Sequence, residues 1–327
     1  GTSVAVRYGI GTLLLVFYVD AFLRGGSPLT WVVFGALVAP SAAGLVVTTR
    51  ALSRATAPAA HDVALATAAA LAVLGLVRGA GLAPVIAASL TGVAAASLAA
   101  LPRIPAAVAA PLYCGAFAGM TSHLVLVGWP AVAIAAALAG TLVSALRTTW
   151  DGVGGKLGLV AFSGVFLTTL VARAVGRIGE GASLVHFDGD DKLALVVVPA
   201  LAAAATWWLR SRAVSPVMAS AAPTAAFALL VTATHGLVLP GDHLPFEATP
   251  LCIAWFGGSF VGMTGAGRVG GRLWPLLLAG ALFGGLQIGF EPTLAGIGGD
   301  FGATASVAVL ATVGTLHLAQ RVTRAHA

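Results

Sequence analysis

A Gly-x-Phe-x-Gly-Met-Thr motif occurs twice in this chain, at residues 115–121 and 258–264. The two glycines of each copy lie four residues apart on one helical face, so neighbouring backbones can approach closely. A helix that breaks at Gly-Met-Thr would instead expose backbone groups and threonine hydroxyls to a central cavity. Helix packing alone and packing combined with pathway lining are both compatible with the motif. The candidate pathway residues are Phe117, Gly119, Met120, Thr121, Ser122, Phe260, Gly262, Met263, Thr264 and Gly265.

The two phenylalanines of the motif, Phe117 and Phe260, are expected to face each other if the motif helices meet. Paired aromatic faces can form an apolar slot for a flat neutral solute, or a gate that excludes water and ions. Both side chains are equally compatible with ordinary core positions.

A Gly-Gly-x-x-Gly element is also duplicated, as Gly154-Gly155-Lys156-Leu157-Gly158 and Gly298-Gly299-Asp300-Phe301-Gly302. Free N–H groups at a helix N-terminus favour anions, and Lys156 adds a cation in the first copy. Asp300 takes the place of that lysine in the second copy, so an anion site is not predicted symmetrically. A tight turn into a helix is the alternative.

The ionisable residues of interest in or beside the apolar stretches are few: Asp20 lies in the first span, His123 follows the first Met-Thr motif, and His235 and Glu291 lie near span ends. No stretch carries the paired central carboxylates of a proton or sodium relay. Histidine titrates near neutrality, so His123 is the candidate for proton coupling, and solvation at a helix end is the alternative.

Other chemistries lack their motifs. The fragment 186–191 has the start of a calcium loop without its distal Glu, and no ATPase, metalloprotease, hydrolase or dinucleotide motif occurs. Cys114 and Cys252 predict no disulfide framework or metal cluster. An intramembrane enzyme would need convergent polar groups, and we expect Arg147, Asp151, Lys156 and His123 to be scattered. The sequence therefore predicts no catalytic site, metal or cofactor.

The composition indicates a membrane protein. Of 327 residues, 59% are hydrophobic and 9% are charged, which excludes an ordinary soluble domain and a disordered chain. The excess of 17 Lys and Arg over 11 Asp and Glu is attributed to membrane topology and not to nucleic-acid binding. We predict an all-α polytopic protein whose partners are the lipid bilayer and a small-molecule solute.

Twelve segments are apolar over about the 20 residues that a spanning helix needs. With the N-terminus inside, twelve Lys and Arg fall in inside segments and five in outside segments, which is the asymmetry expected of cytoplasmic loops. Both termini are then cytoplasmic. The predicted spans are 8–23, 29–48, 61–77, 82–101, 105–121, 129–146, 157–175, 192–209, 214–236, 247–266, 273–290 and 302–319.

The duplicated motifs follow one another at a nearly constant offset, and Trp129-Pro130 likewise matches Trp274-Pro275. Each repeat covers five spans, and an odd number inverts the second copy relative to the first. We therefore predict two N-terminal helices in 1–55, a first repeat in 56–180 and an inverted second repeat in 181–327.

Two inverted five-span halves with related phenylalanines are similar, at the level of architecture, to the urea-transporter group; no residue-level motif is shared. We expect a permease with a channel-like route for a small neutral or weakly ionised solute, because the span interiors are almost free of charge. A proton-coupled carrier of a small anion is the alternative, and an enzyme or a subunit of a membrane complex is a further one. Short loops suggest a bacterial inner membrane, and small-residue faces are compatible with a homo-oligomer.

Overall fold

The computed structural model describes residues 28–50, 59–176, 189–237, 248–294 and 296–325. These residues form eleven α-helices and two short 3₁₀ helices, without a β-strand. The predicted span 8–23 and Asp20 lie outside the described residues. The helices are α2 (Pro28–Arg50), α3 (Ala60–Ala80), α4 (Pro84–Ala99), α5 (Ala109–Gly119), α6 (Trp129–Ala145), α7 (Lys156–Ala174), α8 (Gly189–Ser211), α9 (Pro216–Leu237), α10 (Ala248–Gly262), α11 (Trp274–Leu294) and α12 (Asp300–Ala325).

The all-α prediction is confirmed, and each described helix falls on one of the predicted spans. Within α3, α7, α8, α9 and α12, the described residues include stretches long and apolar enough to cross a membrane. The others are shorter apolar helices. α12 extends furthest beyond its predicted span, to Ala325, whereas α5 and α10 end earlier than predicted, at the motif glycines Gly119 and Gly262.

Local sequence sets several helix boundaries. Proline begins α4 and occupies the first turn of α6, where its missing N–H leaves no hydrogen bond unmade. Gly81 ends α3 in the left-handed conformation, with φ of 68°, and its N–H donates to the carbonyl of Leu76. The predicted helix starts and stops are therefore close to the observed ones.

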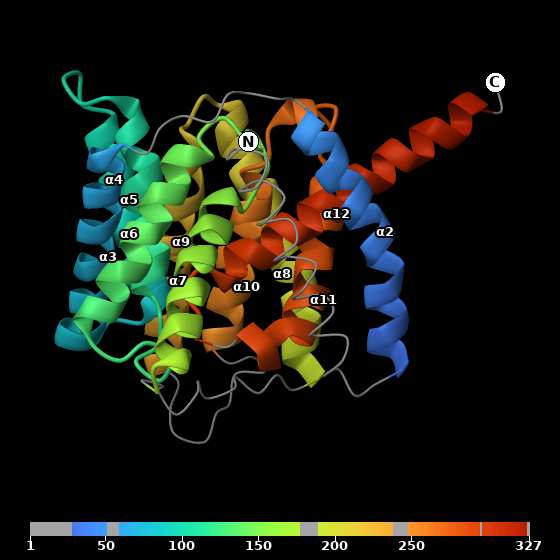
Figure 1. The fold of residues 1–327 in the computed structure, drawn as a ribbon. Helices are drawn as coiled ribbons and strands as arrows, with labels where there is room; N and C mark the ends of the chain where they lie inside the picture. Colours follow the sequence, from blue (N-terminus) through green and yellow to red (C-terminus); the bar gives the residue numbers. More distant parts are fainter. Residues whose placement is uncertain (1–27, 51–58, 177–188, 238–247, 295, 326–327) are drawn as a thin grey trace.

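The helices pack in corresponding sets. In the first half α3 packs against α5 and α6, and in the second half α8 packs against α10 and α11. Contacts between α4 and α9 and between α7 and α12 join the halves, and α2 lies along α12 (Figure 1). Each motif-bearing helix packs against the other helices of its own half: α5 against α3, α4, α6 and α7, and α10 against α8, α9, α11 and α12.

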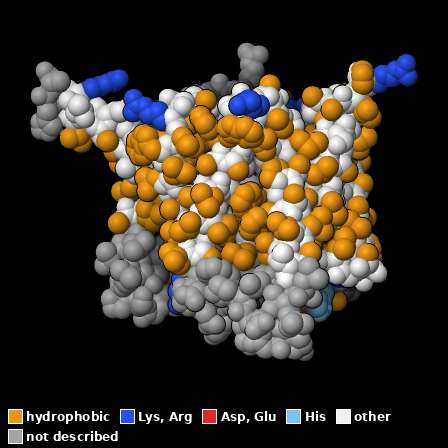
Figure 2. All heavy atoms as spheres, turned by 180° about the vertical axis from the view of Figure 1, so that it is seen from behind, with side chains coloured by type: hydrophobic (Ala, Val, Ile, Leu, Met, Phe, Trp, Pro, Cys, Tyr) orange, Lys and Arg blue, Asp and Glu red, His pale blue; other side chains and the backbone are white. Residues whose placement is uncertain are grey.

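Basic residues gather at the end of the molecule drawn uppermost in Figure 1, which we call the basic end. The segments 100–108, 146–155 and 263–273 and the last turns of α8 and α12 all lie there. Figure 2 shows Lys and Arg along this end, above a face covered by hydrophobic side chains. The basic side chains of these segments are Arg103, Arg147, Arg210, Arg268, Arg272, Arg321 and Arg324.

Candidate functional site

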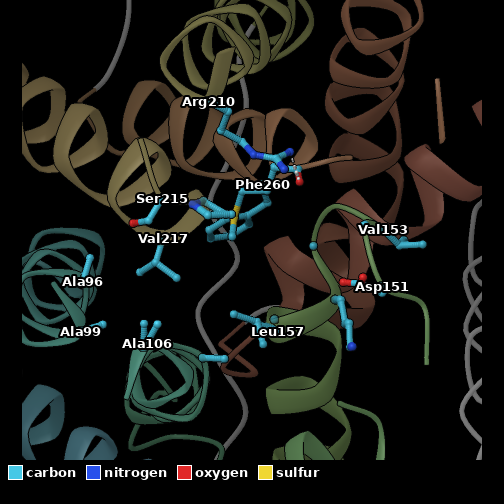
Figure 3. Close-up of a pocket in the computed structure, with 18 of the residues that line it drawn as sticks. Ala96, Ala99, Ala106, Asp151, Val153, Leu157, Arg210, Ser215, Val217 and Phe260 are labelled. Carbon is cyan, nitrogen blue, oxygen red and sulfur yellow. Dashed lines mark hydrogen bonds between the residues drawn. The ribbon is translucent and has the colours of Figure 1, made fainter. Parts of the chain in front are cut away.

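A cavity of about 470 Å³ opens at the basic end and reaches the two motif phenylalanines. Its walls come from α4, α5, the segment before α7, the end of α8, the start of α9 and α10. Figure 3 shows Ala96 and Ala99 on one side of the cavity, with Asp151 and Val153 across from them. The cavity therefore lies between the halves and is lined by both.

The inner end of the cavity is formed by Phe117 and Phe260, each 2% exposed. Their ring centroids lie 5.0 Å apart at an interplanar angle of 64°, an edge-to-face arrangement. Tyr113 and Phe256 extend this into a cluster, with centroids 4.3 Å from Phe117 and 4.5 Å from Phe260, respectively. The two rings meet, as expected from the sequence, but they meet edge to face and not as paired faces, and their role in a pathway stays a prediction.

A buried chain of hydroxyl groups holds this aromatic cluster in place. The hydroxyls of Tyr113 and Ser220 lie 3.3 Å apart, and those of Ser220 and Ser259 lie 2.7 Å apart. The Ser259 hydroxyl also donates to the carbonyl of Phe256. Gly92 leaves room for the Tyr113 ring, because a Cβ at that position would overlap it. The cluster is thus fixed by α4, α9 and α10 together.

The motif glycines perform the packing role. A Cβ on Gly115 would clash with the backbone of Ala66 in α3, and one on Gly258 would clash with the backbone of Pro199 in α8. Gly119 and Gly262 repeat this contact one turn later, against Ala70 and Ala203. These close approaches place Phe117 and Phe260 opposite one another.

Most of the other candidate pathway residues do not line the cavity. The Thr121 and Thr264 hydroxyls each donate, at 2.6 Å, to the carbonyl three residues earlier, which terminates the helix. Met263 does line the cavity. Met120, Ser122 and Gly265 lie in the segments that follow α5 and α10 and do not line it. Only Phe117, Phe260 and Met263 of the ten candidates contribute to the wall.

The two Gly-Gly segments meet the opposite motif in corresponding ways. A Cβ on Gly154 would strike Phe260 O and Thr264 Oγ1, and one on Gly298 would strike Phe117 O and Thr121 Oγ1. Backbone hydrogen bonds join the same regions: Gly265 N to Gly152 O and Ser122 N to Gly296 O, both at 2.9 Å. Each segment is therefore held by the other half of the chain.

Charged residues from three parts of the chain line the cavity, and of these the motif analysis had selected Lys156. Arg147 Nη2 lies 2.6 Å from the carboxylate of Asp62, which is 1% exposed and also accepts a hydrogen bond from Ser144. Lys156 Nζ donates to Arg147 O at 3.0 Å, and Arg210 Nη1 donates to Met263 O and Thr264 O at 2.5 and 2.6 Å.

These charged residues correct one expectation. Arg147, Asp151 and Lys156 were expected to be scattered, but all three line the one cavity together with Arg210. The segment before α7 folds back from the basic end to the motif of α10. Asp151 and Lys156 therefore line the same cavity as Arg210 at the end of α8. The sequence places Arg147 and Arg210 at the predicted cytoplasmic ends of their spans. This shared position was the signal that could have indicated that the two side chains lie close together.

The remaining candidates lie elsewhere. His123 is exposed and does not line the cavity. The side chains of His235 and Glu291 and the fragment 186–191 lie outside what the structure describes. Cys114 and Cys252 are buried free thiols. Among the described residues no group of three His, Cys, Asp or Glu side chains could hold a metal ion.

Comparisons with protein-family models, with curated proteins and with solved structures found no match to this chain.

Proposed function

We propose that this chain is an integral membrane transport protein whose solute pathway runs through the cavity and past Phe117 and Phe260. The observation that carries the proposal is a cavity that is open at the basic end, lies between the two halves and ends at paired aromatic rings. A cavity that ends at an apolar constriction suits passage of a small solute controlled by a gate.

The proposal includes twelve spans and two inverted repeats of five. Corresponding helices support the inversion, because α3 begins at the basic end beside Ser144 whereas α8 ends there at Ser211. Corresponding glycine contacts support it further, since Gly154 meets the α10 motif as Gly298 meets the α5 motif. Inverted halves place a solute site at their junction and predict a second route from the opposite end.

The proposed orientation places the basic end in the cytoplasm, with both termini there, following the excess of Arg and Lys at that end. A bacterial inner membrane is the proposed location. Exposed Trp129 and Trp274, at the starts of α6 and α11, fit the interfacial positions that tryptophan favours in membranes.

The decisive experiment measures solute flux into proteoliposomes that contain the purified protein, across a panel of small neutral and anionic solutes. Phe117→Leu and Phe260→Leu replace the rings of the gate by smaller side chains. Phe162→Leu is the matched control, because Phe162 is a fully buried ring that does not line the cavity.

We expect the wild-type protein to dissipate a gradient of at least one solute. Both gate variants should change that flux severalfold, and the control variant should leave it near the wild-type value. A protein that is folded but carries no solute of the panel, in wild-type or gate-variant form, would contradict the proposal.

A proton-coupled carrier of a small anion is the second candidate, favoured by the three basic side chains in the cavity wall. In that case an imposed pH gradient would drive accumulation above equilibrium, which a channel-like route cannot do. Because His123 is exposed and outside the cavity, His123→Gln should leave accumulation intact if the coupling site lies within the cavity.

A further inference from the structure

The cavity wall carries more positive than negative charge. Arg147, Lys156 and Arg210 line it, and Asp151 is the carboxylate in the lining. The remaining wall is largely apolar, with alanine and glycine as its commonest residues and the two motif phenylalanines among the others. A positively charged recess with apolar walls attracts counter-charge more strongly than an open surface does, since little water is present to screen it.

The charge of Arg147 is compensated within the protein. Its guanidinium lies 2.6 Å from the carboxylate of Asp62, a residue that is buried and does not line the cavity. Ser144 donates to the same carboxylate oxygen. Arg147 therefore shapes the mouth of the cavity, and the uncompensated charge must come from the other two cations.

Lys156 and Arg210 are bound to carbonyl oxygens and not to carboxylates. Lys156 Nζ donates to Arg147 O, and Arg210 Nη1 donates to Met263 O and Thr264 O. Within the described residues, neither cation has a carboxylate oxygen within 4.0 Å. Carbonyl oxygens accept hydrogen bonds without removing the net charge, so both cations can still attract an anion.

Asp151 offsets part of these two charges, because its carboxylate interacts electrostatically with both Lys156 and Arg210. Its side chain is exposed, where solvent weakens its interaction with other charges. Its backbone carbonyl is held by Arg268, with Nε at 3.0 Å and Nη2 at 2.8 Å, which fixes the segment that leads to Lys156. The cavity thus retains a positive excess at its wall.

We propose that the cavity binds a small oxyanion, with its oxygens directed to Lys156 and Arg210 and any apolar part against the alanine wall. The inference rests on the proposed function, because it names the class of solute that the pathway would take. Ammonium and guanidinium groups donate charge-assisted hydrogen bonds to carboxylate, phosphate or sulfate oxygens, which distinguishes such solutes from neutral ones.

The test is direct binding of radiolabelled benzoate to the purified protein in detergent, at constant ionic strength, by scintillation proximity. Unlabelled benzoate, sulfate and benzamide are the competitors. Benzamide has nearly the shape of benzoate without its charge, and sulfate distinguishes an inorganic from an organic oxyanion.

We expect saturable benzoate binding that excess benzoate or sulfate displaces and benzamide does not. Lys156→Gln and Arg210→Gln should each weaken it at least tenfold, while Lys156→Arg should retain most of it. Arg212→Gln is the matched control, because Arg212 lies over the Trp208 ring, with 4.9 Å to the centroid, and does not line the cavity. Thermal unfolding of each variant checks that the fold is intact.

The inference is overturned if no saturable benzoate binding is found, if benzamide competes equally, or if the control variant loses as much affinity as Arg210→Gln. Flux of neutral solutes without oxyanion binding would leave the proposed function standing and remove the inference. Oxyanion binding without any flux, even after the gate substitutions, would remove transport while showing that the cavity is an anion site.

Discussion

The two Gly-Gly segments share a backbone arrangement but carry opposite charges. Gly155 and Gly299 both have positive φ, of 81° and 90°, and each lies against the helix that follows the other segment. The next residue is Lys156 in the first segment, which lines the cavity, and Asp300 in the second, which is 8% exposed. Backbone geometry is therefore common to the two segments, while the chemistry belongs to one of them.

A second comparison gives the same lesson at the helix contacts. Gly140 of α6 lies against the backbone of Asp62, and Gly284 of α11 lies against the backbone of Leu195. Asp62 accepts hydrogen bonds from Ser144 and Arg147, whereas Leu195 joins an apolar cluster that includes Ile288. Corresponding close contacts between helices are thus compatible with either hydrogen-bonded or apolar side chains beside them.

The largest effect is expected from filling the shared glycine positions. Gly155→Ala and Gly299→Ala each force a side chain into a left-handed backbone conformation and against backbone atoms of the opposite half. We expect each to lower the free energy of unfolding by on the order of 3 kcal/mol, measured by thermal unfolding in detergent.

Gly285→Ala supplies the control, because a Cβ there meets nothing within 4 Å. Similar losses in the two copies would strengthen the comparison. A large loss at Gly155 with none at Gly299 would show that the segments are not structurally equivalent.

An intermediate effect is expected at Asp62. Replacing it by Asn removes the charge that pairs with Arg147, whose side chain is 41% exposed and so partly hydrated. We expect the free energy of unfolding to fall by about 1 to 3 kcal/mol, with the exposed Asp151→Asn as the control.

The double variant Asp62→Leu with Ser144→Ile imitates the apolar contact of the second half. It should recover part of the stability lost in Asp62→Leu alone, because the isoleucine removes the hydroxyl that loses its carboxylate but also removes the acceptor of Ala59 N. If the double variant unfolds at a lower temperature than Asp62→Leu alone, the polar contact cannot be replaced by an apolar one.

The smallest effect on stability is expected where the segments differ in charge. Asp300 Oδ1 accepts a hydrogen bond from Phe301 N at 2.7 Å, a role that asparagine can also fill. Asp300→Asn should lower the free energy of unfolding by less than the glycine substitutions do and leave benzoate affinity unchanged, because Asp300 does not line the cavity. Lys156→Gln should also leave the fold stable but should weaken benzoate binding. Equal effects of the two substitutions on benzoate affinity would contradict the assignment of chemistry to the first segment.

Sequence reasoning located the helices because hydropathy and proline or glycine punctuation act locally. It also found Phe117 and Phe260, because the motif that carries them is duplicated. It did not assemble Lys156, Arg210 and Asp151 around one cavity, since their meeting depends on the folding-back of the segment before α7. It assigned Thr121 and Thr264 to the pathway, whereas their hydroxyls are used by the helix ends.

The reciprocal contacts of the glycine segments have a consequence for synthesis. The carbonyl of Gly152 accepts from Gly265, and that of Gly154 accepts from Ser306, so both partners are translated only with the second half. Until then the first half carries backbone groups that have no partner within it, and apolar surroundings make such groups unfavourable. These hydrogen bonds therefore form only after the second half has been synthesised, so the segment before α7 reaches its final backbone pairing late in synthesis.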